Sequence, residues 1–333
     1  MRHSPRRAVA LPAMGLLAFA LVLAAAGLVA GWREVAAELT RLDAALILGL
    51  LALSLANYLL RGLRWWLLAR ANGTALAPGR ALLDYTAGFA LTATPGKLGE
   101  VVRLWLMRRH GGHPYERTMG LLVLDRLSDA LPMLLLVGAG AGAIGGHGAS
   151  VALVGLLVLL PGLLVLRPGP LERATLALHR LTGRAGRLLV RARRAARALG
   201  ELATPGLLAA ACTLGLLGWA AEIAGLAWLM DALGRPIGLP AAAFVFGFAM
   251  LVGALPLFPG GVGGTEATMI ALLVALATPP EVAVAATGVC RLATLGFATL
   301  LGLLALPLAI GWRATGAEPV RVPPTPAASS GCG

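Results

Sequence analysis

The stretch TATPGKLGEVVR, residues 92–103, places charged side chains beside a helix break within apolar sequence. Pro95-Gly96 forms the break, and Lys97, Glu100 and Arg103 follow it. A helix that begins after such a break exposes free N–H groups and the positive end of its dipole. Those groups favour phosphate, and the lysine adds a full positive charge. The stretch therefore predicts a site for an anionic group.

Lys97 is the only lysine among 28 basic residues. Its ammonium is a compact point charge, whereas an arginine guanidinium is a planar fork. Selection for a compact cation and chance both account for a single lysine, and both stay open. Glu100 could balance the lysine when the site is empty, or carry a proton.

A second break, PLFPGGVGG, resembles the first one, and acids and arginines follow both breaks. The residues predicted to bind substrate are Pro95, Gly96, Lys97, Gly99, Glu100, Arg103, Asp125, Arg126, Asp129, Pro259, Gly260, Gly261, Glu266 and Arg291.

Ionisable groups within membrane spans are costly, so they indicate function by default. Asp84 and Glu222 are further ionisable residues in apolar segments. We expect two ion pairs, one joining Glu100 to Arg126 and one joining Glu266 to Arg291. The alternative to a binding role is a set of buried ion pairs that fix helix register.

The composition indicates that the protein positioning these residues is a polytopic membrane protein. The chain of 333 residues is 58% hydrophobic and 13% charged, and its mean hydropathy is +0.83. Soluble domains carry far more charge. The net charge of +13 comes from arginines between apolar runs, which favours positive-inside topology over nucleic-acid binding. The three cysteines show no spacing typical of metal or redox sites.

Apolar runs predict six full spans and two shorter broken segments. The spans are expected at about residues 8–30, 44–60, 118–139, 150–166, 205–230 and 282–310. The segment RGLRWWLLAR, residues 61–70, is interpreted as a cytoplasmic interface collar. The broken segments, residues 81–107 and 241–277, are too short on each side of the break to cross a bilayer core of about 30 Å. They predict re-entrant hairpins, which are tolerated only inside protein or beside a watery cavity.

The two halves of the chain repeat each other. Trp65, Pro95 and Arg126 recur about 164 residues later as Trp228, Pro259 and Arg291. With an odd number of crossings between them, the copies have opposite orientation. Inverted repeats with broken helices near the midplane are typical of transporters. The predicted fold class is thus an all-α polytopic membrane protein with two re-entrant hairpins arranged as an inverted repeat.

The expected organisation is one transmembrane domain, residues 1–312, and a disordered cytoplasmic tail, residues 313–333. Within the domain, the repeats cover about residues 44–140 and 205–311. Between them, arginines on one helical face predict an amphipathic helix at about residues 170–200, on the cytoplasmic membrane surface. Both termini are expected in the cytoplasm.

The segments RWWLLARANG, GFALTATPGKLGEVVRLWLM, LLVLDRLSDALP and PLFPGGVGGTEA resemble the lysylphosphatidylglycerol synthase transmembrane-region family, also called flippase-like domain proteins. The resemblance covers about residues 10–312. It implies a bacterial inner-membrane protein that moves a lipid or lipid-linked molecule between leaflets. The full-length synthase has an aminoacyl-transferase domain after its membrane part, and no such segment follows here. We therefore expect no synthesis of aminoacyl lipid.

Two other classes stay open, a membrane enzyme that acts on a lipid phosphate and a non-catalytic partner subunit. The D-G-x-x-A-R element of CDP-alcohol phosphotransferases and the Ser-Arg-Ser-Gly motif of polyprenyl-diphosphate phosphatases are absent. No nucleotide-binding motif of the G-x-x-x-x-G-K-[ST] type is present either. We expect no catalysis, no cofactor and no metal. The expected partners are membrane lipids, mainly anionic; a homo-oligomer and a partner lipid-modifying enzyme stay open, and no nucleic acid is expected.

Overall fold

The computed structural model describes residues 20–74, 76–92, 98–113, 115–144, 204–255 and 261–311, together with Leu17, Thr94 and Leu153. Several predictions fall outside the described residues. They are the break residues Pro95, Gly96, Lys97, Pro259 and Gly260, the span at 150–166, the amphipathic helix at 170–200 and the tail at 313–333.

Every regular element in the described ranges is helical. Besides the helix at Ala20–Ala30, the elements are α2 (Trp32–Leu39), α3 (Ala44–Ala71), α4 (Pro78–Ala87), the 3₁₀ turn η1 (Gly88–Leu91), α5 (Leu98–Gly111), α6 (Tyr115–Ile144), α10 (Pro205–Ala232), α11 (Gly238–Ala254), α12 (Gly264–Ala275), α13 (Pro280–Arg291), the π-helical turn η4 (Leu292–Gly296) and α14 (Phe297–Gly311).

Three helical segments are long and apolar enough to cross a membrane, namely Ala44–Ala71, Pro205–Ala232 and the continuous run Pro280–Gly311. A fourth results if Ala20–Ala30 and α2, which bend by 107° at Gly31, form one span. The described part thus provides three or four candidate spans of the six expected. Together with the apolar composition, they establish a membrane protein.

Local signals explain where these helices begin. The Asp43 carboxylate accepts a hydrogen bond from the backbone N–H of Leu46 at 2.7 Å and so caps α3. Thr204 caps α10 in the same way, and Pro205 occupies the first helical position. Helix α3 continues well past the predicted end at residue 60, because the segment 61–70 is helical and packs against other helices.

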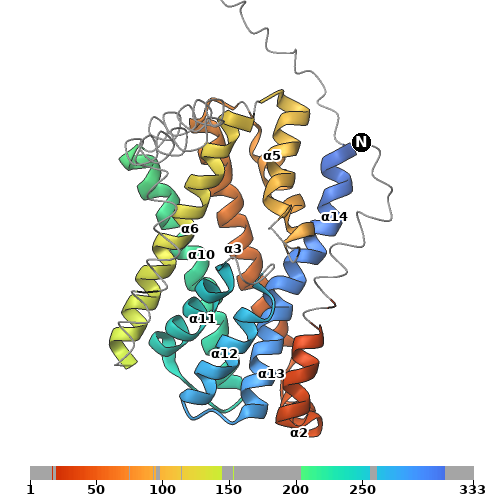
Figure 1. Ribbon diagram of the computed structural model, residues 1–333, viewed down its shortest axis with the longest axis vertical. Coiled ribbons are helices and arrows are strands. Elements are labelled where there is room, and N and C mark those ends of the chain that lie inside the picture. The colour runs from red at the N-terminus through yellow and green to blue at the C-terminus, as the bar shows by residue number, and fades with distance from the viewer. Residues whose placement is uncertain are drawn as a thin grey trace, which may run out of the picture.

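The long helices run side by side along the long axis of the molecule, and the short helices of the two halves lie toward opposite ends (Figure 1). Helix α10 packs along α3, and α14 packs against α4 and η1. The broken segment predicted at 81–107 begins earlier, at Pro78, and its first part tightens into η1 before the break, whereas α11 and α12 flank the second break close to the predicted bounds.

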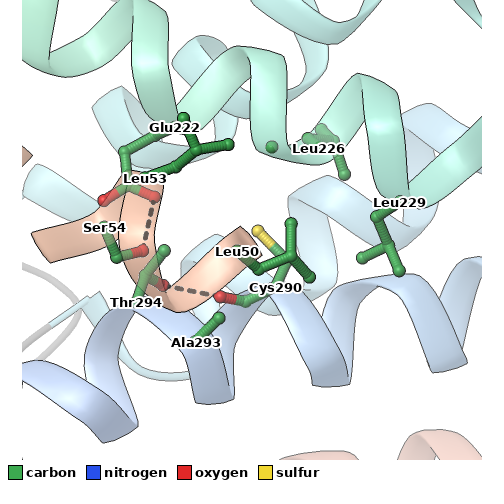
Figure 2. Close-up of a pocket in the computed structure, with 10 residues that line it drawn as sticks. Leu50, Leu53, Ser54, Glu222, Leu226, Leu229, Cys290, Ala293 and Thr294 are labelled. Carbon is green, nitrogen blue, oxygen red and sulfur yellow. Dashed lines mark hydrogen bonds between the residues drawn. The ribbon is translucent and has the colours of Figure 1, made fainter. Parts of the chain in front are cut away.

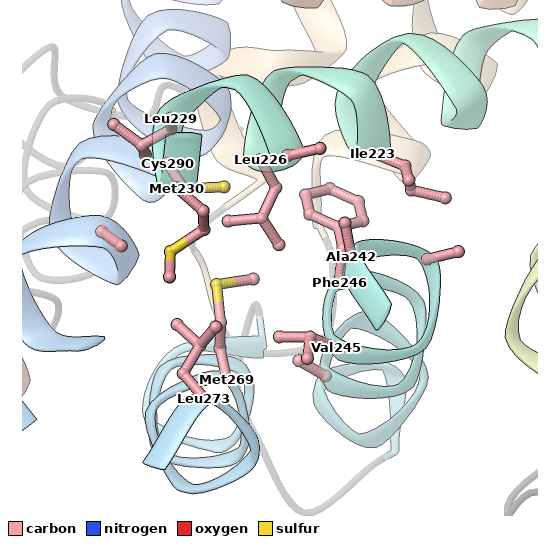
Figure 3. Packing of buried hydrophobic residues seen from close by; sticks show 14 of the residues in the cluster. Ile223, Leu226, Leu229, Met230, Ala242, Val245, Phe246, Met269, Leu273 and Cys290 are labelled. Atoms are coloured by element: carbon pink, nitrogen blue, oxygen red, sulfur yellow. The ribbon is translucent and has the colours of Figure 1, made fainter. Parts of the chain in front are cut away.

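The larger apolar core holds the second pair of short helices against α10. Figure 3 shows Leu226 and Met230 of α10 facing Phe246 of α11 and Met269 of α12. All four side chains are at most 1% exposed. A separate aromatic core around Trp65, Tyr85 and Phe89 joins α3, α4 and η1 at the other hairpin. Each pair of short helices therefore has its own anchor of buried side chains.

Candidate anion site in the arginine–carboxylate cluster

Seven charged side chains meet between α3, α5 and α6. We call them the arginine–carboxylate cluster; its members are Arg61, Arg64, Glu100, Arg103, Asp125, Arg126 and Asp129. Four arginines face three carboxylates, so the cluster holds one positive charge in excess when all are ionised.

Arg64 is the buried centre of the cluster. Its Nη2 lies 2.7 Å from Asp125 Oδ1, and its Nη1 lies 2.7 Å from Asp129 Oδ1. Nη1 also donates to the Ser128 carbonyl at 3.2 Å. That carbonyl has no helical N–H partner four residues later, because the residue there is Pro132. A proline inside α6 thus supplies an acceptor for a buried guanidinium.

Arg61 lies one turn before Arg64 on α3. Its Nη2 lies 2.5 Å from Asp129 Oδ2, and its guanidinium stacks on the Trp219 ring at 4.9 Å from the centroid. The indole N–H of Trp219 donates to the Asp129 backbone carbonyl at 3.2 Å. Helix α10 can come this close because residue 215 is glycine. A Cβ at that position would overlap the Ser128 carbonyl oxygen.

Arg126 is the most exposed arginine of the cluster, with 35% of its side chain accessible. It lies 2.6 Å from Asp125, 3.2 Å from Asp129 and 3.3 Å from Glu100. The predicted Glu100–Arg126 pair is therefore confirmed. Since the other three arginines are nearly or fully buried, Arg126 is the cluster member that an outside anion can reach.

Arg103 is held against an aromatic face. Its guanidinium lies 3.7 Å from the centroid of the Tyr85 ring, and its Nε donates to the Tyr85 carbonyl at 3.2 Å. Within the described part of the chain, Arg61 Nε, Arg103 Nη1 and Arg126 Nε make no hydrogen bond. Buried N–H groups of this kind are costly unless a ligand or water satisfies them.

Close backbone contact places the start of α5 beside the cluster. A Cβ on Gly99 would overlap the carbonyl oxygen of Gly88 in the preceding turn. A Cβ on Gly302 of α14 would likewise overlap the backbone at Ala90. Only glycine permits these approaches. Helix α5 begins at Leu98, which follows Lys97 in the chain, and carries Glu100 and Arg103.

The two helices that follow the second break, α12 and α13, are joined by a separate, buried ion pair. Arg291 Nε lies 2.6 Å from Glu266 Oε1, as predicted, and both side chains are at most 4% exposed. Glu266 Oε2 also accepts from the Gly263 backbone N–H at 2.6 Å, which caps α12. Gly261 has a φ of 76°, which favours glycine, and packs against Gly253.

The structure thus divides the predicted residues into two groups. Six of them, Gly99, Glu100, Arg103, Asp125, Arg126 and Asp129, lie at the first hairpin, and Gly261, Glu266 and Arg291 lie at the second. Of the other ionisable candidates, Asp84 pairs with Arg80 at 2.8 Å, and Glu222 accepts from Ser54 and Asn57.

The interpretation of residues 61–70 as an interface collar was wrong for its first half. Arg64 and Trp65 are 0% exposed, and Arg61 is mostly buried. The spacing of Ser54, Asn57, Arg61 and Arg64, which is 3, 4 and 3, marks one polar face on an otherwise apolar helix. That pattern was the signal that could have revealed both arginines.

In the described ranges, no three His, Cys, Asp or Glu side chains converge as metal ligands do. Asp125 and Asp129 are instead surrounded by guanidinium groups. The arrangement is suited to binding an anion through arginines rather than to holding a cation through carboxylates.

Comparisons with known proteins give one family. A family model described as the lysylphosphatidylglycerol synthase TM region matches residues 15–302. A curated relative, a UPF0104 membrane protein from Methanothermobacter thermautotrophicus, is 36% identical over 89 residues, which is 27% of this chain. The aligned part spans only 26% of that relative's length.

Proposed function

We propose that this chain, which belongs to the lysylphosphatidylglycerol synthase transmembrane-region family, moves an anionic lipid or lipid-linked molecule between the two leaflets of a bacterial inner membrane. Family membership and the membrane-spanning helices support a role in membrane lipid biology. The transport step, the inner-membrane location and the cytoplasmic position of both termini are the proposal.

The observation that carries the proposal is the excess positive charge of the arginine–carboxylate cluster. A buried cluster with four arginines and three acids attracts an anion. Arg126, with 35% of its side chain accessible, offers the contact point, and three guanidinium N–H groups have no hydrogen-bond partner within the described ranges. Arginine forks suit the oxygens of a lipid phosphate.

The two hairpins support an inverted-repeat transporter. In both, the helix after the break carries a glutamate in its first turn, Glu100 in α5 and Glu266 in α12. Each glutamate pairs with an arginine on the next helix, Arg126 or Arg291, at 3.3 and 2.6 Å. The two sets of short helices lie toward opposite ends of the molecule (Figure 1). Broken helices in that arrangement are typical of transporter sites.

The two pairs differ in a way that suits directional movement. Arg126 is partly exposed and belongs to a cluster with excess charge, whereas Arg291 and Glu266 form a closed neutral pair. We propose that the headgroup binds at the first hairpin, on the cytoplasmic side. Its phosphate would contact Arg126 and Lys97, and Glu100 would release Arg126 for that contact.

A phosphotransferase is the second candidate and is less well supported. It would need carboxylates that are free to hold a metal. Asp125 and Asp129 each contact at least two arginines within 4 Å. We therefore propose a transporter without catalytic activity. Robust Mg²⁺-dependent product formation by the purified protein would overturn this part.

The test is a flip assay with a fluorescent phosphatidylglycerol in proteoliposomes. Arg126→Gln should lower the flip rate about tenfold or more, because a hydrogen bond to a charged group contributes roughly 1.5–3 kcal/mol. Lys97→Ala and Glu100→Ala should also stop movement, and Lys97→Arg should restore it only in part.

Arg235→Gln is the matched control for Arg126→Gln. Arg235 is exposed and lies outside the cluster, so the same substitution removes the same charge without touching the site. Melting temperatures separate loss of function from loss of folding. If both Lys97→Ala and Arg126→Gln flip lipid at the wild-type rate, the proposed site is wrong.

A further inference from the structure

Glu222 lies at the contact between α10, α3 and the π-helical turn η4, away from the arginine–carboxylate cluster. Its side chain is 5% exposed. It faces a small pocket that is also lined by Ser54, Cys290 and Thr294 and by apolar side chains. Figure 2 shows the carboxylate turned toward Ser54 at the edge of this pocket.

Neutral donors are the hydrogen-bond partners of this carboxylate. Ser54 Oγ donates to Oε2 at 3.1 Å, and Asn57 Nδ2 donates to Oε1 at 2.9 Å. In the part of the chain that the structure describes, no cation lies within ion-pair distance of Glu222. A buried carboxylate without a cation is costly when ionised, so uptake of a proton relieves the cost.

The two arginines and the tyrosine near Glu222 bind other partners. On α3, Arg61 pairs with Asp129, and the Tyr58 hydroxyl donates to the Thr294 carbonyl at 2.6 Å. On α13, Arg291 pairs with Glu266, and the Cys290 thiol lines the pocket. These four are the charged or titratable groups that face Glu222 from the packed helices. None of them forms an ion pair with it.

A protonated Glu222 also finds an acceptor. Asn57 Oδ1 is buried and makes no hydrogen bond within the described residues. A half-turn of the Asn57 amide would present this oxygen to the new O–H group of Glu222. The Ser54 hydroxyl can accept as readily as it donates. The site therefore has hydrogen-bond partners for both the charged and the neutral form.

The pocket lies beside the π-helical turn within the last candidate span. The turn η4, Leu292–Gly296, interrupts the run from α13 to α14 and contributes Thr294 to the pocket. Single π-helical turns inside α-helices are frequent at functional sites. The Tyr58–Thr294 hydrogen bond joins this turn to the helix that also carries Ser54 and Asn57.

We propose that Glu222 is a proton-binding site within the membrane and that its proton exchange drives the helix movement needed for lipid transport. The second half of the statement rests on the proposed function; the first half does not. No bond other than O–H changes, because the carboxylate takes up one proton and later releases it.

The first experiment tests the proton site alone. Wild-type protein in lipid bilayers is compared at acid and alkaline pH by infrared difference spectroscopy. A carboxylic-acid C=O band should appear on acidification and be lost in Glu222→Gln. Glu34→Gln, the same change at an exposed glutamate, should keep that band. If the wild-type and Glu222→Gln spectra match, the proton site does not exist.

Ser54→Ala keeps the test valid if Glu222→Gln fails to fold. It removes one hydrogen bond to the carboxylate, so the same band should remain but shift in frequency. An unshifted band in Ser54→Ala would overturn the assignment to Glu222.

The second experiment tests coupling with the same fluorescent phosphatidylglycerol in proteoliposomes under an imposed pH gradient. The gradient should accelerate movement in wild type and Glu34→Gln but not in Glu222→Gln. Gradient-independent movement with an intact infrared band would overturn coupling and leave transport standing. The infrared band without any lipid movement would overturn the proposed function and leave the proton site standing.

Discussion

Arg64 and Asp125 are separated by 61 residues in the chain, yet Nη2 of the arginine lies 2.7 Å from Oδ1 of the aspartate, with both side chains fully buried. The pair joins α3 to α6 and fixes the position of the cluster that we propose as the anion site. Its energetics should be those of a buried ion pair, in which loss of one partner leaves the other uncompensated.

We expect Arg64→Met and Asp125→Leu each to lower the free energy of unfolding by about 3–5 kcal/mol. The double variant should lose much less than the sum, because no unpaired charge between these two positions remains. Denaturation by sodium dodecyl sulfate in mixed micelles measures the free energy of unfolding of the wild type, the two single variants and the double variant. Additive losses would mean that the two side chains do not interact.

Two glycine-to-alanine substitutions should have different effects on stability, because Gly99 lies in the close contact between η1 and α5 and Gly138 has open space around it. Gly99→Ala should destabilise the protein by about 1–3 kcal/mol, because the new Cβ would overlap the Gly88 carbonyl. Gly138→Ala in α6 should be neutral or stabilise by about 0.5–1 kcal/mol, since nothing lies within 4 Å of its Cβ position. Melting temperatures in detergent give the comparison. Equal melting temperatures of the two variants would contradict the close approach.

Substitutions at Arg103 and Tyr85 distinguish the contribution of the Tyr85 ring face to stability from that of the Tyr85 hydroxyl. Arg103→Lys should cost about 0.5–2 kcal/mol, because the ammonium loses the planar stack on the ring at 3.7 Å. Tyr85→Phe keeps the ring and removes a hydroxyl without a hydrogen-bond partner among the described residues, so it should be neutral or mildly stabilising. Thermal unfolding measures both variants. A larger loss for Tyr85→Phe would mean that the hydroxyl, not the ring face, matters.

Glu266 has two structural tasks at the second hairpin, since it caps α12 and neutralises Arg291. Glu266→Ala should therefore lower the free energy of unfolding by about 3–5 kcal/mol. Glu281→Gln, a change at a glutamate outside this pair, is the control and should cost less than about 0.5 kcal/mol. The same denaturation assay applies. A small loss in Glu266→Ala would suggest that Arg291 finds another anion.

The proposed topology is tested by single cysteines at exposed positions near opposite ends of the bundle. Ala71→Cys lies in the last turn of α3, and Arg235→Cys lies between α10 and α11. After Cys212, Cys290 and Cys332 are replaced, an impermeant thiol reagent added to intact cells should label position 235 and not position 71. Labelling of position 71 before cell lysis would reverse the orientation.

The amino-acid sequence by itself determined the membrane class and the family, because apolar runs and the motifs around the breaks are local properties. It also predicted the Glu100–Arg126 and Glu266–Arg291 pairs, since the repeat places the same residue types at matching positions. Both breaks were predictable, because adjacent proline and glycine residues disfavour a helix through local backbone effects.

Only the tertiary structure decided which arginines belong to the site. Arg61 and Arg64 have the sequence context of an interface collar, and their burial depends on α6 and α10, which come much later in the chain. The Ser128 carbonyl became an acceptor only because Pro132 and Arg64 meet across two helices. Glu222 likewise acquires its neutral partners from α3, 165 and 168 residues earlier in the chain. Such contacts depend on helix packing, which a local pattern does not encode.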